Sequence, residues 1–499
     1  MDNTANISTF NRWIITAAVM LATVMQVLDM TIVNVALPHM QGSLHTDPDE
    51  ITWALTSYLV SSAIFMPLTG YFNDRLGQKK FMLICIAGFA IASALCGAAE
   101  NLTQIVLFRF IQGAIGAAMV PISQSVMATI FPLKERGMAM AIWGMGVMLG
   151  PILGPTLGGY LTQVASWRWV FYVNVPLGIL TFLLCLAYLP DTSKKERSMD
   201  WTGFIFLSVF IGCMQYVLDQ GNEKDWFNDT SICIALISCI LSFLAFIYYN
   251  LGPIKKPVFN LAIFKDRNFS IASLILLVLG LGLFGAMVLQ PLMMENLLNY
   301  PVLTTGLIMA PRGLGGIASM IVAGKLSNKV DTRYLIAFGT ICGAIGMYMP
   351  TNYSLQVDTW WLMWPIVLQG IGLGFIFTPL STIAFATLPS EYRTEAAGLF
   401  SLVRTLGGSI GIAIVITLFT RDTQKAWNHL GGFIQPDNNP ALYQYLNTLH
   451  LNADSINGAT IISQTVFAEA QMTAFINAYA FVSLCFLMML PLVFLLKKP

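Results

Sequence analysis

Long apolar stretches separated by short polar connections run along the whole chain. A stretch of about 18 or more apolar residues is long enough to cross about 30 Å of hydrocarbon as a helix. Such stretches fall near residues 14–37, 52–72, 81–99, 103–125, 137–161, 169–189, 202–219, 231–250, 269–294, 303–325, 333–350, 360–381, 396–419 and 472–495. The pattern predicts an all-α, polytopic membrane protein with 14 transmembrane helices.

The positive charges in the predicted connections are strongly biased to one side of the membrane. Of the 26 Lys and Arg residues, three lie inside predicted spans and only four lie opposite the N-terminus: Arg168, Lys224, Arg421 and Lys425. The other nineteen lie on the side of the N-terminus. This bias predicts that both termini are cytoplasmic. It also supports the helix count, because one missed or extra helix would scramble the alternation.

Composition agrees with a membrane protein and excludes several other classes. The 499 residues are 56% hydrophobic and 10% charged, whereas soluble domains have about 25% charged residues. The net charge of +1 says nothing for or against nucleic acid, but the chain has no basic tail and we expect no nucleic-acid partner. The chain contains no G-x-x-x-x-G-K-[ST] or H-E-x-x-H motif. We therefore expect no enzyme activity, no use of ATP, no metal site and no cofactor.

An internal repeat divides the chain into two halves. The paired segments are GYFNDRLGQKK (70–80) with GKLSNKVDTRY (324–334), and IQG (111–113) with LQG (368–370). The repeat predicts two six-helix bundles, at 1–190 and 269–499, with two inserted helices in 191–268. Chance similarity between short polar turns is the alternative. Duplicated bundles place a substrate path at their interface, near the midplane of the membrane.

One carboxylate and one guanidinium are predicted at the same depth in the first bundle. Asp29 lies in the apolar run VLDMTIVNVALP (27–38), where a charge costs about 2.5–3.5 kcal/mol. At 1.5 Å per residue, Asp29 and Arg109 both lie about 12–14 Å below the outer surface. They are therefore candidates for an ion pair that exchanges protons, and a static pair is the alternative. Gln26 and Asn34 share the helix face of Asp29 and should face inward with it.

A second motif, GPILGPTLGG (150–159), has glycines every four residues. Gly150, Gly154 and Gly158 form a smooth stripe on which another helix can pack closely. Pro155 favours a bend. The stripe is a static packing seam, or this helix seals against the opposite bundle in one state and bends or slides in another.

Together these motifs resemble the major facilitator superfamily. The segment 70–80 resembles the loop between the second and third helices of that superfamily, and its fourth-helix motif resembles RFIQGAIGAA (109–118). The antiporter motif of the superfamily resembles GPILGPTLGG (150–159). The first-helix motif of drug:proton antiporters resembles LDMTIVNVALP (28–38). With 14 helices the chain resembles the fourteen-span drug:proton antiporters. The long segment 421–470 is most similar to that of EmrB-type members of Gram-negative inner membranes. Gln78 departs from the family loop, which usually has Arg there.

The resemblance implies the major facilitator fold and proton-driven export of hydrophobic or amphipathic compounds by alternating access. The implied proton-coupling residues are Asp29 and Arg109. The implied gating residues are Asp74, Arg75, Gly150, Gly154, Pro155, Gly158 and Gly159; a solvated charge run is the alternative for the first two. The outer segment 421–470 implies docking to a periplasmic adaptor protein and, through it, to an outer-membrane channel, and a self-packed cap is the alternative. The rival within transport is a proton-coupled importer or facilitator of a small amphipathic metabolite. The rival outside transport is a membrane-embedded enzyme acting on lipids or a non-transporting sensor.

The remaining candidates are less specific. A substrate cavity is predicted from Gln26, Asn34, Tyr58, Phe65, Trp143, Glu295, Phe375 and Phe377, although aromatic residues in membranes commonly pack or face lipid, and Glu295 also suits an exposed helix end. Arg312 and Arg404 lie in the glycine-rich segments APRGLGG and LVRTLGGSIG. Arginines inside predicted spans are candidates for function by default, and structural pairing remains open for both.

Overall fold

A computed structural model describes residues 8–132, 135–192, 194, 198–252, 260–327, 329–432, 444 and 456–497. The described residues form helices and turns and contain no strand. The prediction of an all-α polytopic membrane protein is therefore confirmed.

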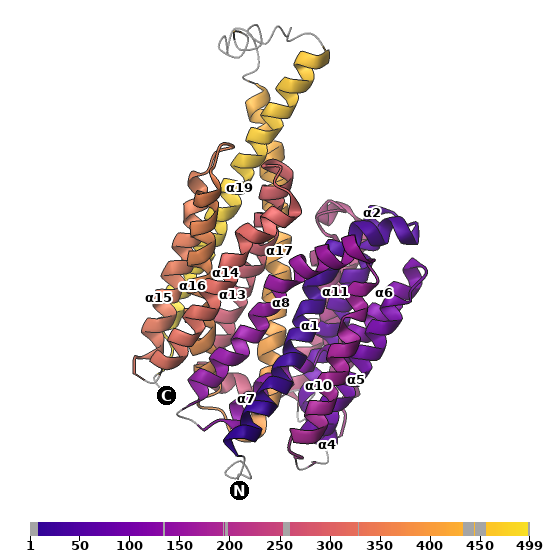
Figure 1. Cartoon of the computed structure of the whole chain (residues 1–499), viewed down its shortest axis with the longest axis vertical. Helices are drawn as coiled ribbons and strands as arrows, with labels where there is room; N and C mark the ends of the chain where they lie inside the picture. The colour runs from indigo at the N-terminus through magenta and orange to yellow at the C-terminus, as the bar shows by residue number, and fades with distance from the viewer. Residues whose placement is uncertain are drawn as a thin grey trace.

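The first bundle occupies one half of the molecule (Figure 1). Its helices are α1 (Thr9–Leu44), α2 (Pro48–Ile51), α3 (Trp53–Phe65), α4 (Thr69–Leu76), α5 (Gln78–Gly97), α6 (Leu102–Gly116), α7 (Met119–Ile130), α8 (Arg136–Val164), α9 (Trp169–Tyr172) and α10 (Asn174–Tyr188).

The second bundle lies beside the first and ends in two very long helices. Its helices are α13 (Arg267–Leu292), α14 (Val302–Leu326), α15 (Thr332–Tyr348), α16 (Thr359–Ala384), α17 (Arg393–Gly431) and α19 (Ile456–Phe494). The start of α1 and the end of α19 lie at the same end of the molecule (Figure 1). We call this end the terminal side and the opposite end the far side.

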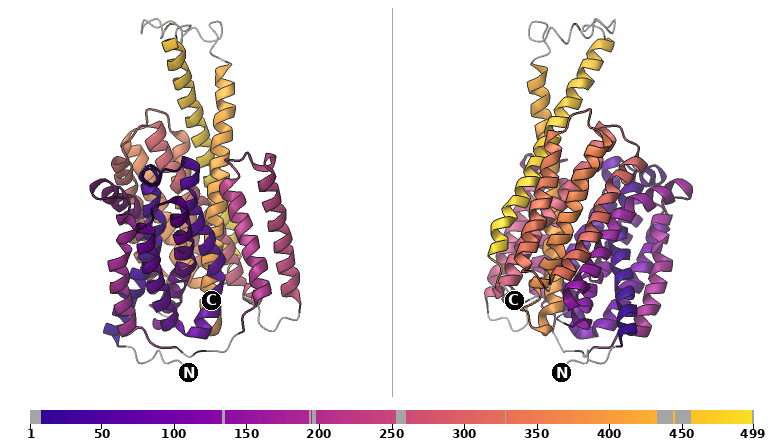
Figure 2. Two further views of the ribbon diagram at one scale, coloured as in Figure 1. Left: turned by 90° about the vertical axis from the view of Figure 1, so that its right-hand side faces the viewer. Right: turned by 60° about the vertical axis from the view of Figure 1, so that its left-hand side comes forward.

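Two further helices, α11 (Trp201–Gln220) and α12 (Thr230–Leu251), stand at one edge of the molecule (Figure 2). Helix α11 contacts α3 of the first bundle and α17 of the second, while α12 packs on α11. The side-chain amide of Gln215 donates a hydrogen bond of 2.8 Å to Ser409 Oγ on α17. Phe65 of α3 packs against Phe204 of α11, with ring centroids 5.9 Å apart. The inserted pair is thus attached to both bundles through α11.

Thirteen helices among the described residues are long and apolar enough to cross a membrane. The fourteenth predicted span, 52–72, is divided into α3, a 3-10 turn (η2, Met66–Leu68) and α4. Pro67 lies in that turn, and proline lacks the backbone N–H that a continuous α-helix requires. The apolar pattern therefore located the span correctly but could not show that its helix is broken.

In the predicted outer segment 421–470, the described stretches 421–431 and 456–470 are helical. Helices α17 and α19 each contain 39 residues, or about 58 Å at 1.5 Å per residue. They extend well beyond the other helices on the far side (Figure 2). Most of 433–455 lies outside the described residues.

The two bundles touch closely on the terminal side. Ser125 of α7 and Thr394 of α17 share a hydrogen bond of 2.8 Å between their hydroxyl groups. A Cβ atom at Gly70 of α4 would lie 2.9 Å from Glu395 Cβ on α17, which leaves no room for a larger residue. Helix α8 also lies against α14 and α16 of the second bundle. The terminal side is therefore closed between the bundles.

Candidate functional site: a buried ion pair in the first bundle

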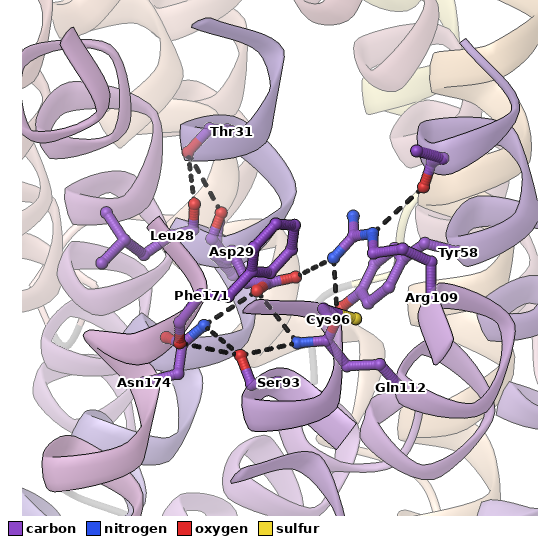
Figure 3. A network of polar contacts seen from close by, with 12 residues as sticks. Leu28, Asp29, Thr31, Tyr58, Ser93, Cys96, Arg109, Gln112, Phe171 and Asn174 are labelled. Atoms are coloured by element: carbon purple, nitrogen blue, oxygen red, sulfur yellow. Dashed lines mark hydrogen bonds and ion pairs between the residues drawn. The ribbon is translucent and has the colours of Figure 1, made fainter. Parts of the chain in front are cut away.

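Asp29 and Arg109 form an ion pair inside the first bundle (Figure 3). Arg109 Nη1 lies 2.5 Å from Asp29 Oδ2, and both residues are fully buried. They come from α1 and α6, two helices that run in opposite directions, as their predicted common depth requires. The sequence prediction thus brought the correct two residues together, while their role in proton coupling remains a prediction.

Neutral amides surround the carboxylate and fix its second oxygen. Gln112 Nε2 donates to Asp29 Oδ1 at 3.0 Å, and Asn174 Nδ2 donates to the same oxygen at 2.8 Å. Both amides also donate to Ser93 Oγ, at 3.2 and 3.0 Å. The carboxylate therefore receives hydrogen bonds from α6 and α10, and the serine of α5 links the two donors (Figure 3).

The guanidinium of Arg109 is held by three kinds of contact. Its Nε donates to the carbonyl oxygen of Ala54 at 3.0 Å, and its Nη1 donates to Gln112 Oε1 at 2.8 Å. Its central carbon lies 4.2 Å from the ring centroid of Tyr58, a cation–π geometry that a dry site strengthens. These contacts fix the position of the charge that faces Asp29.

Local sequence allows α6 to approach α3 closely enough for these contacts. Gly113 is the glycine of the IQG motif (111–113), and a Cβ atom there would collide with Ser61 Oγ and with the carbonyl of Tyr58. The side chain of Asn101 caps the start of α6 by accepting a hydrogen bond from the Gln104 N–H at 2.9 Å. The helix therefore begins at a defined residue and carries Arg109 to a defined depth.

The glycine stripe of α8 faces α1, in the same bundle. A Cβ atom at Gly150 would lie 2.7 Å from the backbone carbon of Val27, and one at Gly158 would lie 2.8 Å from the carbonyl oxygen of Ile32. Thr31 Oγ1 also donates to the carbonyl oxygen of Gly150 at 3.0 Å. In this structure Gly150 and Gly158 therefore contact the helix that carries Asp29, while the expected movement of α8 between states stays a prediction.

Other positions of the same helix reach the second bundle. Ile152 of α8 lies against Gly313 of α14, and Gly144 lies next to Phe377 of α16 and Met320 of α14. Pro155 is half-buried within the continuous helix α8, and a Cβ atom at Gly159 would meet nothing closer than 3.9 Å. Helix α8 thus lies between the Asp29 helix and the opposite bundle.

Gln26 and Asn34, which were expected to face inward with Asp29, lie in different environments. Gln26 is buried, but its Oε1 accepts a hydrogen bond from the Val120 N–H at 2.9 Å, which ties α1 to α7. Asn34 is exposed, so the predicted inward polar face does not continue to it. The amides that do bind Asp29 come from other helices.

The predicted aromatic cavity residues do not gather around one space. Trp143 and Phe377 stack at 5.5 Å across the interface between the bundles. Phe375 packs edge-on against Phe338 inside the second bundle, 5.0 Å away. A far-side cavity of about 550 Å³ is lined instead by Glu50, Trp53, Ser57, Leu102, Thr103, Val106, Leu107 and Phe110. The prediction of a shared aromatic cavity is not supported for these residues.

The remaining candidates lie elsewhere. Glu295 is half-buried in a π-helical turn (η6, Met293–Leu297) near the far end of α13. Arg75 is exposed on the terminal side and donates to Tyr71 Oη at 2.5 Å, beside the half-buried Asp74. Arg404 lies in α17, and its side chain forms no hydrogen bond or ion pair with any described residue.

Arg312 has a polar environment of its own in the second bundle. Its Nη2 donates to Gln290 and, at 2.8 Å, to Gln369 Oε1. Structural pairing, which sequence reasoning left open, is therefore provided by two amides.

Three residues of the site were missed from the sequence: Gln112, Ser93 and Asn174. Gln112 is three residues after Arg109, on the same face of α6, where side chains one turn apart are neighbours. Ser93 and Asn174 are polar residues within apolar runs. A search of the sequence for every amide and hydroxyl side chain inside the predicted spans would have found these residues. It would not have shown that they gather around Asp29.

The arrangement can bind and release a proton without moving a charge into a wholly apolar space. The ionised carboxylate is balanced by Arg109 and solvated by two amide donors. Protonation of Asp29 removes the ion pair and leaves Arg109 held by neutral acceptors and the Tyr58 ring. Since the partners come from α3, α5, α6 and α10, a change of charge at Asp29 alters contacts between five helices.

Known proteins similar to this chain agree on a transporter fold. The sequence profile described as Major Facilitator Superfamily matches residues 19–412. The chain is 34% identical to the multidrug export protein EmrB of Escherichia coli (strain K12), covering 97% of this chain and 95% of that protein. It is 33% identical to the fatty acid resistance protein FarB of Neisseria gonorrhoeae, covering 97% and 96%. The crystal structure of the human organic anion transporter MFSD10 (TETRAN) has a TM-score of 0.62 at 14% identity, covering 97% and 99%, and so shows the fold alone.

Proposed function

This chain belongs to the major facilitator superfamily, among its EmrB-type multidrug exporters, and we propose that it exports hydrophobic or amphipathic compounds in exchange for protons by alternating access. The observation that carries the proton coupling is the fully buried Asp29–Arg109 pair. A carboxylate inside a spanning helix is costly, and this cost is explained if its charge changes during transport.

The proposed coupling runs through direct contacts between helices. Protonation of Asp29 loosens the bonds of α1 to α6 and α10. Helix α1 is packed along the glycine stripe of α8, two residues from Asp29 at Thr31. Helix α8 in turn contacts α14 and α16 of the second bundle. A shift of α1 can therefore change how the two bundles meet, which is the element that alternating access requires.

The energy source in this proposal is the proton gradient, with no cofactor. Its electrical part is worth about 2.3 kcal/mol per charge per 100 mV. We place this multi-pass protein in the bacterial inner membrane with both termini in the cytoplasm, as the bias of Lys and Arg suggests. The closed terminal side is then the cytoplasmic side, and Asp29 exchanges protons with the outside in a state that opens on the far side.

The test replaces the carboxylate by its neutral isostere. Protein with Asp29→Asn, reconstituted in liposomes, should lose drug transport driven by a pH gradient. The matched control is Asp219→Asn, because Asp219 lies on α11 and bonds to Thr56 outside the Asp29 network. The control should keep gradient-driven transport. Full transport by Asp29→Asn would refute the proposed role of Asp29.

The same liposomes separate export from the rival importer or facilitator. Under an imposed pH gradient, an antiporter moves the compound against the direction of proton flow. Movement of the tracer with the protons indicates a symporter, and movement independent of the gradient indicates a facilitator. Either result would contradict the proposed exchange.

We also propose that the far-side extensions of α17 and α19 bind a periplasmic adaptor protein that leads to an outer-membrane channel. The two extensions meet through Trp427 and Phe467, whose ring centroids are 5.2 Å apart. Phe467 remains 44% exposed and Ile461 38% exposed, so an apolar edge is available to a partner.

Co-purification tests this partner. A variant with Ile461→Ser and Phe467→Ser should lose the adaptor but keep transport in liposomes. Substitutions of exposed apolar residues on the lipid-facing α12, such as Leu241→Ala, serve as the control. Adaptor binding that survives the double substitution would exclude this edge as the docking surface.

A further inference from the structure

The far-side cavity lies within the first bundle, away from the second. All the residues that line it belong to α2, α3 and α6. Helix α6 packs on α3 and α5 of the same bundle and stands at the edge of the molecule (Figure 1). The volume of about 550 Å³ is in the range of cavities that hold small molecules. Leu107 and Phe110 on one wall are 54% and 38% exposed, so the cavity opens sideways toward the surrounding lipid.

One end of this cavity is charged and the other is apolar. Glu50 lies at the far-side end, on α2, three residues before α3 begins at Trp53. Val106 and Phe110 line the deeper part, and Phe110 follows Leu102, the first residue of α6, by eight residues or about 12 Å. Tryptophan is typical of the boundary between membrane and water. Glu50 therefore lies on the aqueous side of that boundary, and the apolar wall extends below it into the hydrocarbon.

The charged end of the cavity suits a cation. Glu50 is the only charged residue among those that line the cavity. It is exposed and forms no ion pair with any described residue. Trp53 lines the cavity beside it, and tryptophan rings attract quaternary ammonium groups. The indole stacks on Tyr216 of α11, with ring centroids 6.2 Å apart, which holds it in place. A carboxylate and a fixed aromatic ring are thus available to one positive group.

The cavity is separate from the buried ion pair, although both use α3. Trp53 and Ser57 line the cavity. The residues that follow them, Ala54 and Tyr58, contact Arg109 through the Ala54 carbonyl oxygen and the Tyr58 ring. Successive residues of a helix point about 100° apart. The cavity and the ion pair therefore lie on different faces of the same helix.

We propose that the far-side cavity binds an amphipathic cation, with its ammonium group beside Glu50 and Trp53 and its apolar chain along Val106 and Phe110. The chain gains little by leaving lipid, because lipid tails are as apolar as the lining. The carboxylate therefore decides which amphipathic molecules bind. The site lies outside the interface between the bundles and does not depend on the proposed direction or coupling of transport.

Binding of tritiated decyltrimethylammonium to the purified full-length protein in lipid nanodiscs tests the site, and empty nanodiscs give the background. Unlabelled decyltrimethylammonium should displace the probe. Decanol, which is neutral, and decanoate, which is an anion, should not displace it, although their chains have the same length. Equal displacement by all three would overturn the proposal. Loss of binding when the nanodiscs contain phosphatidylethanolamine would also overturn it, because the cavity would then hold a lipid headgroup.

Substitutions of the carboxylate separate recognition of charge from loss of folding. Glu50→Gln should weaken binding of the cation about fivefold, as expected for one exposed ion pair. Glu50→Lys should reverse the preference, so that the protein binds decanoate better than decyltrimethylammonium, a gain that misfolding cannot produce. The matched control is Glu100→Lys, because Glu100 is exposed two residues before α6 and does not line the cavity. It should keep the wild-type preference. An unchanged preference in Glu50→Lys would contradict the proposal.

Photolabelling locates the site in the wild-type protein without any substitution. A decylammonium probe with a diazirine in its chain is activated by light, and mass spectrometry identifies the labelled residues. The label should fall in 53–57 or 102–110, and excess decyltrimethylammonium should remove it. Label confined to segments outside α2, α3 and α6 would refute the site.

Discussion

At the scale of single residues, Asp29 and Arg109 depend on each other for burial. Removing one partner of a buried pair leaves the other charge unpaired and costs about 3–5 kcal/mol, whereas removing both can be nearly neutral. Stability and transport should therefore respond differently to substitutions in this pair. The amides of Gln112 and Asn174 can still solvate a neutral side chain at position 29.

A double substitution separates the two effects. Arg109→Gln alone should lower the free energy of unfolding by about 3–5 kcal/mol. Adding Asp29→Asn should recover much of that stability, because no charge then remains buried. Unfolding of the purified variants in detergent measures this recovery, and liposome assays should find both variants inactive in gradient-driven transport. A double variant whose losses simply add would show that the two residues do not act as a pair.

At the scale of helices, the seam between α1 and α8 connects the proton site to the bundle interface. The glycines of α8 remove the side chains that would keep the helices apart, which is the physical meaning of a small-xxx-small stripe. The stripe therefore controls how closely α8 follows α1. Gly154 and Gly159, five residues apart in α8, differ sharply in how closely they approach α1.

Gly154 and Gly159 provide a matched pair for this seam. A Cβ atom at Gly154 would collide with Thr31 Oγ1, while one at Gly159 would meet only Val35 Cγ1 at 3.9 Å. Gly154→Ala should cost about 1–3 kcal/mol by overpacking and reduce transport. Gly159→Ala should change both by little. Thermal unfolding and drug export by cells measure the two effects, and equal sensitivity at both positions would show that close contact with α1 is not what the motif provides.

At the scale of the whole molecule, the two bundles meet on the terminal side through α4, α7 and α17. Alternating access requires this contact to open in another state. The hydroxyl groups of Ser125 and Thr394 are close enough that two cysteines at these positions could be bridged. This position offers a direct test of whether opening is needed for transport.

Cross-linking these positions should arrest the cycle. With Ser125→Cys and Thr394→Cys in a background without the native cysteines, an oxidant should join the two bundles and abolish transport. A reductant should restore it, and either single cysteine should be insensitive to oxidant. Transport that continues in fully cross-linked protein would mean that this side does not open.

The sequence predicted the site better than its surroundings. Asp29 and Arg109 were found because charges inside apolar spans are rare, and their depth followed from counting residues along two helices. Asn34 was expected to face inward with Asp29 because helical periodicity gives an angle around the axis. Periodicity does not say which helix occupies that angle, and Asn34 is exposed.

The sequence by itself determined the properties that each segment carries alone: an all-helical membrane protein, the positions of the spans, the repeat, and a carboxylate and an arginine at one depth. Those follow from local hydrophobicity and helical rise. Only the tertiary structure decided that Asn174, 145 residues from Asp29, binds the same carboxylate. Likewise, it decided that the glycine stripe faces α1 and that Arg312 is left with amides. These contacts join distant segments, and the free energy that selects them comes from packing many helices at once.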